Sequence, residues 1–293
     1  MIRRDEYERP TALRAMQSLA SRISPFASWR HSGDAAWAVT LLAEADHCPS
    51  SVWSEDGETR AWALFETPEE LTVQVDPALP GLADAVLAWA EQTASAPELS
   101  VTISEVEKHV TDALRARGYT EAADGPFFAV LRHDLKALPP VPALPAGYTI
   151  RSVGDDDLAA RADVHRAVWN NDKITPQRHR AMRATWPYKP EFDLMAVGPD
   201  GGAAAYVQGW YDEHSRVGLF EPVGTRTEHR RLGLSRTLGL AVLHAFAAAG
   251  ARIATVNPRG DAAYPVPKLV YESIGFRAYS RSHTYVKRLS QEP

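Results

Sequence analysis

The sequence has very little of three things: cysteine, long apolar runs and surplus positive charge. Its single cysteine, Cys48, excludes a disulfide within the chain and a cysteine-rich zinc site. No apolar segment opens the sequence, so nothing indicates secretion or membrane insertion, and we expect a cytoplasmic protein. The formal net charge of -5 disfavours nucleic acid as the main partner, because nucleic-acid-binding domains usually present a basic face.

Several catalytic signatures are also missing. The sequence contains no G-x-S-x-G, H-E-x-x-H, Walker or Rossmann string, and its 10 histidines lack the spacing of metal ligands. A hydrolase or a metalloenzyme therefore has no support, and we expect no metal. The composition is that of an ordinary globular protein, with 45% hydrophobic and 24% charged residues, which disfavours disorder. A chain of 293 residues is long enough for two domains.

A proline-rich segment divides the chain. Residues 136–147 read K-A-L-P-P-V-P-A-L-P-A-G, which favours an extended, semi-rigid linker over a helix. We therefore predict an N-terminal domain over residues 1–135 and a C-terminal domain over residues 148–293. Strands and helices follow one another in a similar order in both halves, which indicates a distant internal duplication.

The periodicity of apolar residues predicts the individual elements. In the first half we expect helices at 11–23, 34–45, 81–92 and 106–117, and strands at 51–53, 60–65, 71–75 and 99–103, with two more ending near 135. In the second half we expect helices at 155–169, 175–185, 267–274 and one that ends at 250, and strands at 148–153, 193–197, 203–211, 217–223 and 252–256, with two more at the end.

The most informative stretch lies in the second half. An apolar run, Val217–Val223, leads into the basic turn His229–Arg236, and a long helical pattern then ends at Gly250. A strand, a cationic turn and a helix together form an anion cradle, because the first N–H groups of a helix and its dipole favour phosphate. Gly233 and Ser235 keep the turn thin, so that a phosphate can approach the backbone.

Two motifs carry a resemblance to a known family. The spacing Arg230-x-x-Gly233-x-Ser235 resembles the R/Q-x-x-G-x-G/A signature of the GNAT acyltransferase superfamily, and Tyr271-Glu272-Ser273-Ile274-Gly275-Phe276 resembles its L-Y-x-x-x-G-F motif. The layout resembles tandem GNAT proteins, distantly mycothiol synthase and more closely actinobacterial tandem acetyltransferases. The resemblance implies an α/β (α+β) fold of two tandem domains, each a mixed, mainly antiparallel sheet flanked by helices.

The resemblance also implies acetyl-CoA as the acyl donor. In the family, the strand before the turn splays from its neighbour and binds the pantetheine arm through its backbone. Here the backbone N–H of Val223 is the candidate for polarising the thioester carbonyl. The residues expected to contact the coenzyme are Val223, Gly224, Thr225, Arg230, Arg231, Leu232, Gly233, Leu234, Ser235, Arg236 and Asn257.

Two side chains are candidates for the proton transfers. By resemblance, Tyr271 is the general acid that protonates the departing coenzyme A thiolate, although a core tyrosine with a satisfied hydroxyl is the alternative. Glu221 lies inside an apolar run, where an unpaired charge is costly, and two residues before Val223, which places both on one face of a strand. We predict that it accepts the amine proton; a salt bridge to a nearby arginine is the alternative.

Four further residues are candidates for binding the acceptor. Trp186 and Tyr188 stand on either side of a proline and suit a rigid pocket wall or an interdomain contact. Asp261 and Tyr264 lie in a segment that is longer than the family pattern allows, and this segment shapes the acceptor pocket or is a plain surface loop. The sequence does not identify the acceptor.

The corresponding turn of the first half, D-P-A-L-P-G-L-A from Asp76, has no arginine or lysine, and its carboxylate would repel a diphosphate. We therefore expect the C-terminal domain to move an acetyl group from acetyl-CoA to the amine of a small molecule, and the N-terminal domain to be structural or to shape the acceptor site. A non-catalytic acyl-CoA sensor or scaffold, and a GNAT fold with a different acyl donor, are alternatives. The protein is expected to be a monomer or a homodimer.

Overall fold

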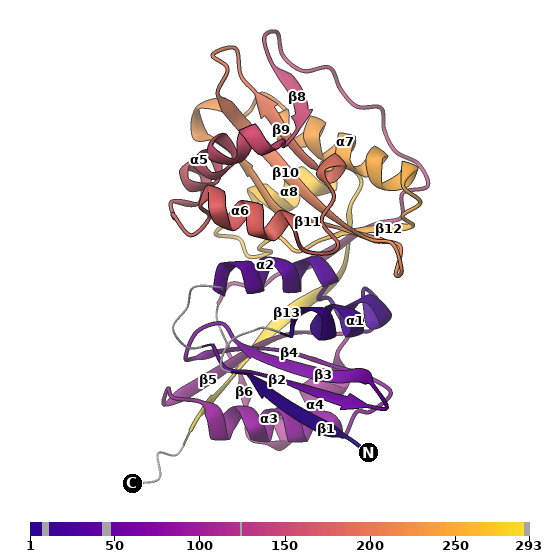
Figure 1. The fold of residues 1–293 in the computed structure, drawn as a ribbon, viewed down its shortest axis with the longest axis vertical. Helices are drawn as coiled ribbons and strands as arrows, with labels where there is room; N and C mark the ends of the chain where they lie inside the picture. Colours follow the sequence, from indigo (N-terminus) through magenta and orange to yellow (C-terminus); the bar gives the residue numbers. More distant parts are fainter. Residues whose placement is uncertain (8–11, 43–47, 124, 290–293) are drawn as a thin grey trace. The chain divides into compact units, whose positions relative to one another are not determined.

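The computed structural model describes residues 1–7, 12–42, 48–123 and 125–289 (Figure 1). Its internal contacts divide the chain into two compact units. Unit 1 comprises residues 1–130, 259–263 and 280–293, and unit 2 comprises residues 131–258 and 264–279. The predicted domains differ from these units chiefly because the last residues of the chain belong to unit 1.

Unit 1 contains the sheet order β1-β2-β3-β4-β5-β13, with β6 also paired to β13. Its strands are β1 (Arg3–Tyr7), β2 (Ser50–Glu55), β3 (Glu58–Phe65), β4 (Glu70–Val75), β5 (Glu98–Ser104), β6 (Thr120–Glu121) and the later part of β13 (Arg277–Arg288). Its helices are α1 (Leu13–Ile23), α2 (Ser32–Leu42), α3 (Leu82–Thr93) and α4 (Lys108–Ala116). The predicted helix at 34–45 begins two residues earlier than expected, and its residues 43–45 lie outside the described part.

The alternation of side chains along β3 builds two cores in unit 1. Trp62 and Leu64 pack with the apolar face of α1, whereas Ala63 and Phe65 join the cluster that includes α3 and α4. Because successive side chains of a strand point to opposite faces, one sheet serves both layers.

Unit 2 contains the sheet order β7-β12-β11-β10-β9-β8. Its strands are β7 (Ala129–His133), β8 (Thr149–Ser152), β9 (Asp193–Val197), β10 (Ala203–Asp212), β11 (Val217–Thr225) and β12 (Ile253–Val256). Its helices are α5 (Leu158–Trp169), α6 (Pro176–Arg183), α7 (Leu234–Ala248) and α8 (Val266–Ser273), with short 3-10 helices η1 (Asp155–Asp157), η2 (Pro190–Phe192) and η3 (Thr227–His229). The pairs β7–β12, β8–β9, β9–β10 and β10–β11 are antiparallel, and β11–β12 is parallel. The predicted mixed, mainly antiparallel sheet is thus confirmed.

Helices cover both faces of this sheet (Figure 1). Val164 of α5 packs with Met195 and Tyr206. A Cβ placed at Gly209 would instead meet Phe246 and Val242 of α7 at 2.8 and 2.9 Å, so α7 covers the opposite face. From Tyr206 onward, side chains at even positions of β10 therefore face α5 and α6, because neighbouring residues of a strand alternate.

The C-terminal strand differs from the prediction of two final strands. β13 runs without interruption from Arg277 to Arg288, because no glycine or proline breaks the segment. Its residues 282–288 pair antiparallel with residues 98–104 of β5. Tyr285 lies in the unit 1 core with 2% of its surface exposed. The end of the chain therefore completes the sheet of unit 1.

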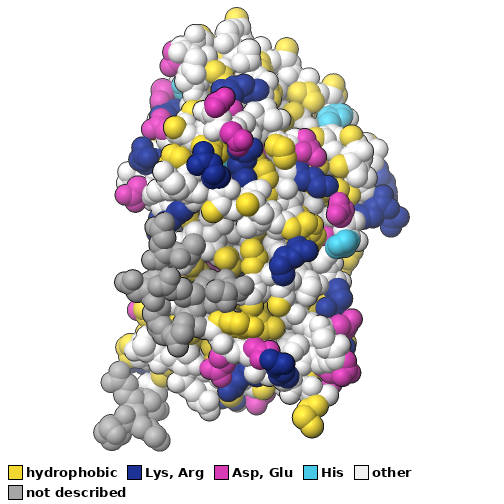
Figure 2. Space-filling model, in the orientation of Figure 1, with side chains coloured by type: hydrophobic (Ala, Val, Ile, Leu, Met, Phe, Trp, Pro, Cys, Tyr) yellow, Lys and Arg dark blue, Asp and Glu magenta, His cyan; other side chains and the backbone are white. Residues whose placement is uncertain are grey.

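Two sequence expectations concern the exterior of the protein. None of the helices in the described part of the chain combines the length and apolarity that a membrane crossing requires. On the face drawn in Figure 2, basic and acidic side chains are interspersed.

Candidate active site in unit 2

Strand β11 separates from β12 halfway along its length. The two strands pair only from Val217 to Leu219, opposite Ile253 to Thr255. β11 nevertheless continues against β10 as far as Thr225. Its later half thus has no β12 partner on one side, which is the splay that the family resemblance implies.

A β-bulge lies at the point of separation. Phe220 pairs with Gly209 and Val223 with Val207, so two residues of β11, Glu221 and Pro222, stand opposite Gln208 alone. A bulge adds a residue to one strand and changes which face the following side chains point to. Even spacing is therefore not a sufficient reason to place Glu221 and Val223 on one face, although both are half-buried.

The two glycines of β11 show the change of face directly. A Cβ at Gly218 would meet Phe246 of α7 at 2.4 Å. A Cβ at Gly224 would instead meet Tyr206 and Val168, both at 2.8 Å, on the α5 side. Even-numbered side chains of β11 therefore point toward α7 before the bulge and toward α5 after it. The one sequence signal for this bulge is Pro222, since proline inside a sheet is confined to edges and bulges.

Tyr271 lies on α8 with 8% of its surface exposed. Its ring is 6.4 Å from that of Phe220 and 5.9 Å from that of Phe276, measured between centroids. Within the described part of the chain its hydroxyl has no hydrogen-bond partner. Burial raises the pKa of Tyr271, and the neighbouring Glu221 raises it further, so the phenol keeps its proton.

The groups that influence Tyr271 define the centre of the site. Besides Glu221 these are the hydroxyl groups of Tyr206 and Tyr264, which also raise the pKa of Tyr271. Tyr206 is fully buried, and burial raises its own pKa to about 12. The structure thus brings Glu221, Tyr264 and Tyr271 within electrostatic reach of one another. Tyr206 is an addition that sequence reasoning missed, because nothing in its spacing links it to the motifs.

The turn before α7 has the shape of an anion cradle. Arg231 and Gly233 both adopt positive φ angles, 64° and 78°. Gly233 is the N-cap of α7, and no side chain caps the helix start. A Cβ at Gly233 would meet no protein atom within 4 Å. Backbone N–H groups at an uncapped helix start beside open space are what an anion needs.

Side chains fix this turn to the neighbouring elements. The hydroxyls of Thr225 and Ser235 lie 2.7 Å apart and connect the end of β11 to the start of α7. Arg230 Nε donates to the Thr225 carbonyl at 3.4 Å. Arg236 donates to the carbonyl of Ser273 at the end of α8, which ties the two helices together. Arg236 therefore has a structural partner besides any role in the cradle.

The remaining candidate coenzyme contacts vary in burial. Arg231 and Leu232 are exposed, and the side chain of Arg231 bonds to no other described residue. Leu234 is 1% exposed and anchors the start of α7 in the core. Asn257 follows β12, and its Oδ1 is buried without a hydrogen-bond partner among the described residues.

The structure separates the four residues predicted to bind the acceptor. Tyr188 donates its hydroxyl to Asp193 Oδ2 at 3.1 Å, so this group belongs to a buried network. The ring of Trp186 lies 5.8 Å from that of His214. Asp261 belongs to unit 1 and pairs with Arg259 at 2.8 Å, whereas Tyr264 belongs to unit 2. Of the four, Tyr264 alone influences the pKa of Tyr271.

The corresponding turn of unit 1 already holds a carboxylate. Asp76 accepts hydrogen bonds from Arg22 at 3.0 Å, Arg60 at 3.2 Å and the Ala78 N–H at 3.0 Å. Burial opposes ionisation, but these hydrogen bonds lower the pKa of Asp76, so it stays charged. The Asp76 carboxylate thus accepts the hydrogen bond of a backbone N–H that would otherwise be free to bind a phosphate.

Residues of unit 1 also fill the side of β4. β4 and β5 pair only through Glu70 and Leu71. Beyond that point Gln74 donates to Ser28 Oγ at 3.0 Å and to the Arg30 carbonyl at 3.2 Å. The side chain of Gln74 beside the splay is thus bonded to the segment between α1 and α2.

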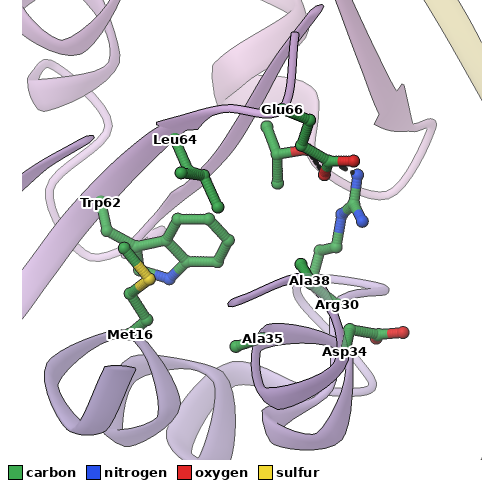
Figure 3. Close-up of a pocket in the computed structure, with 9 residues that line it drawn as sticks. Met16, Arg30, Asp34, Ala35, Ala38, Trp62, Leu64 and Glu66 are labelled. Atoms are coloured by element: carbon green, nitrogen blue, oxygen red, sulfur yellow. Dashed lines mark hydrogen bonds between the residues drawn. The ribbon is translucent and has the colours of Figure 1, made fainter. Parts of the chain in front are cut away.

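A small pocket of unit 1 lies between these helices and the sheet (Figure 3). Met16, Trp62 and Leu64 are among its lining residues. Thr72 connects two of its charged residues: Arg30 donates to the Thr72 hydroxyl at 3.1 Å, and Thr72 donates to Glu66 at 2.5 Å. The pocket therefore does not repeat the arrangement around Tyr271. No group of three or more potential metal ligands occurs among the residues described.

Comparisons with known proteins bear on the fold. No protein-family model matches the sequence, and no curated protein matches it. Among solved structures, a tandem GNAT protein from the clavulanic acid biosynthesis pathway matches with a TM-score of 0.71 at 18% identity, covering 100% of both chains. A GCN5-related N-acetyltransferase from Sphaerobacter thermophilus matches with a TM-score of 0.63 at 20% identity, covering 100% of this chain and 97% of its own.

A GNAT-family acetyltransferase from Colwellia psychrerythraea gives a TM-score of 0.63 at 11% identity and covers 97% of this chain and 99% of its own. Likeness at such low identity establishes architecture, not chemistry. The comparison with mycothiol synthase stays a prediction. With its two compact units, its splayed strand and its uncapped basic turn, the chain has the fold of the tandem GNAT acetyltransferases.

Proposed function

We propose that unit 2 transfers an acetyl group from acetyl-CoA to the amine of a small molecule. The observation that carries this proposal is the basic turn Arg230–Arg236, in which two residues with positive φ lead into an uncapped helix beside the splayed end of β11. Such a turn favours a diphosphate through its N–H groups, the helix dipole and flanking arginines. The solved tandem GNAT structure of the same fold supports the assignment.

The residues present suit coenzyme A. Arg230 and Arg231 would flank its diphosphate, and the buried, unpartnered Oδ1 of Asn257 offers an acceptor at the end of β12. The free edge of β11 beyond Leu219 would pair with an amide-containing arm, as an added strand does. When bound, acetyl-CoA supplies a thioester whose carbonyl carbon is the electrophile.

Two side chains would move protons in this reaction. Glu221, placed in the bulge, would accept a proton from the amine directly or through water. Tyr271 keeps its proton because burial and Glu221 raise its pKa, so it is able to donate that proton to the departing thiolate. The two roles are compatible, since one residue gains a proton while the other loses one.

Unit 1 would not catalyse acyl transfer. Asp76 already satisfies a backbone N–H of the corresponding turn, and Gln74 is bonded to the segment beside β4. A diphosphate there would have to displace an ion-paired carboxylate of the same sign. We therefore assign unit 1 a structural or acceptor-shaping role.

Calorimetry with acetyl-CoA tests the first step. Reversing charge in Arg230→Glu/Arg231→Glu is expected to weaken acetyl-CoA binding by about 10-fold or more, because charge-assisted hydrogen bonds to phosphate are among the stronger polar contacts. Arg252→Glu is the matched control, since Arg252 is also exposed in unit 2 but precedes β12 at the opposite end of the strand pair. Equal affinity in wild type and double variant would contradict the cradle.

Release of the coenzyme A thiol in the presence of primary amines tests the second step. Turnover of an amine supports the transferase. Binding of acetyl-CoA without turnover on any amine would favour an acyl-CoA sensor, and binding of a longer acyl-CoA in preference to acetyl-CoA would indicate a different donor.

A further inference from the structure

A buried tryptophan holds the bulge that carries Glu221. The indole Nε1–H of Trp210 donates to the main-chain carbonyl of Glu221 at 2.6 Å. Trp210 lies on β10, pairs in register with Leu219 and has 0% of its surface exposed. Residues of a bulge lose part of the regular ladder of hydrogen bonds. The indole therefore satisfies a carbonyl at the irregular position of the strand.

The ring of Trp210 packs in turn against another aromatic ring. The ring of Tyr188 meets it edge-on, at an interplanar angle of 79° and 6.1 Å between centroids. The hydroxyl of Tyr188 donates to Asp193 Oδ2, which also interacts with His179 Nε2 at 3.2 Å. Asp193 and His179 are both fully buried, and Arg161 lies 3.6 Å from the other carboxylate oxygen.

This chain of contacts ends at the peptide that sets the direction of the Glu221 side chain. Because the peptide group is planar, anchoring the Glu221 carbonyl restricts the ψ angle of Glu221 and so restricts where its Cα–Cβ bond points. A general base must lie within hydrogen-bond reach of the proton it takes, so a small rotation of this peptide would move the carboxylate out of range.

We propose that Trp210 is a positioning residue for Glu221, acting through the Glu221 carbonyl, with Tyr188 and Asp193 holding the indole in place. The inference rests on the proposed transferase function. It gives Tyr188 the role of supporting the residue that positions the base, whereas the sequence suggested a pocket wall or an interdomain contact. Trp210 touches no reacting atom in this scheme.

Trp210→Phe removes the N–H while keeping an aromatic ring. We expect kcat for acetyl transfer to fall by about 10-fold to 100-fold, since misplacement by about 1 Å costs that much. The calorimetric Kd of acetyl-CoA is expected to stay within about twofold, because the cradle lies on another element. The probes are acetyl-CoA and a panel of spermidine, tyramine, glucosamine and a lysine-containing peptide, with thiol release as the signal.

Trp89→Phe is the matched control. Trp89 is likewise buried, at 3% exposure, but it lies in unit 1 and its indole nitrogen has no hydrogen-bond partner among the described residues. Lower kcat in both variants would point to a general effect of losing a buried indole and contradict the positioning role. A fall confined to Trp210→Phe, with unchanged acetyl-CoA affinity, supports the positioning role.

Proton exchange of the Trp210 indole gives a readout that does not need turnover. Its ¹⁵N–¹H signal is assigned by its disappearance in Trp210→Phe and should exchange with solvent much more slowly than the indole signals of the urea-unfolded protein, because the Trp210 indole is fully buried and hydrogen-bonded. Fast exchange would overturn the inference, as would unchanged kcat in a Trp210→Phe variant of an active enzyme. Failure of the wild type to acetylate any amine would contradict the proposed function itself and the role of Trp210 with it.

Discussion

At the scale of single residues, Tyr271 offers the sharpest test of the chemistry. Its hydroxyl is buried beside Glu221 and keeps its proton. We expect Tyr271→Phe to lower kcat by about 100-fold, the usual contribution of general acid catalysis, with little change in acetyl-CoA affinity. Steady-state kinetics and calorimetry measure the two quantities.

Tyr119→Phe serves as its control. Tyr119 is a buried tyrosine of unit 1 whose hydroxyl also lacks a hydrogen-bond partner in the described part of the chain. Unchanged turnover in Tyr271→Phe, with chemistry rate-limiting, would remove Tyr271 from the mechanism.

Glu107 makes a residue-scale prediction about stability. It is fully buried, and burial raises its pKa to about 7, although a hydrogen bond from Ser28 and the charge of Arg30 oppose the rise. A carboxyl whose pKa is higher in the folded state loses stability when it ionises. Its contribution is therefore complete below pH 4.5 and disappears as the pH rises through 7. The difference between 4.5 and about 7 corresponds to about 3 kcal/mol.

Urea unfolding at pH 5 and pH 8 measures this effect. The loss of stability between the two values should be smaller by about 2 kcal/mol in Glu107→Gln than in wild type, because part of the effect already falls below pH 5. Glu105→Gln, at an exposed position, should leave the loss unchanged. An equal loss in wild type and Glu107→Gln would show that this carboxyl is not the group responsible.

At the scale of elements, the turn before α7 depends on its glycine. Gly233 has a φ of +78°, and a Cβ added there would meet nothing within 4 Å; Gly201, in the turn between β9 and β10, has a φ of +81° and equal space. Alanine at either site should therefore cost a similar amount of stability, about 1 kcal/mol, because a side chain is strained in the left-handed region that glycine tolerates. We expect Gly233→Ala alone to weaken acetyl-CoA binding, by about 10-fold, because it thickens the cradle. Equal effects of both variants on affinity would contradict the cradle.

Also at this scale, the sequence predicts features that depend on local residue patterns. It does not predict features that depend on contacts between segments distant in the sequence. The helix at 81–92 and the turn–helix pair around Gly233 follow from spacing and glycine, whereas the segment 136–147, expected to link two domains, lies inside unit 2. The bulge at Glu221 does not follow from local patterns, because it is a property of two strands in register, and only Pro222 hints at it. The hydroxyl of Tyr188 points into a buried network for the same reason: its partner Asp193 becomes a neighbour only in the folded chain.

At the scale of the whole molecule, β13 ties the end of the chain to unit 1. Deleting residues 280–293 removes the antiparallel partner of β5 and takes Tyr285 out of the core. Loss of one large aromatic side chain from a core typically costs about 3–5 kcal/mol, so we expect unit 1 to be severely destabilised. Hydrogen exchange followed by mass spectrometry should show lost protection at residues 98–104. Unchanged protection there would contradict the pairing.

The same strand has a consequence for synthesis on the ribosome. Unit 1 begins with the first residues of the chain but cannot close its sheet until residues 282–288 have emerged, after nearly all of unit 2 has been translated. At elongation rates of about 5–20 residues per second, the roughly 150 intervening residues impose a wait of about 8–30 s. During that interval the edge of β5 is a site where a nascent chain is exposed to chaperones, so the half that is made first is the half that matures last.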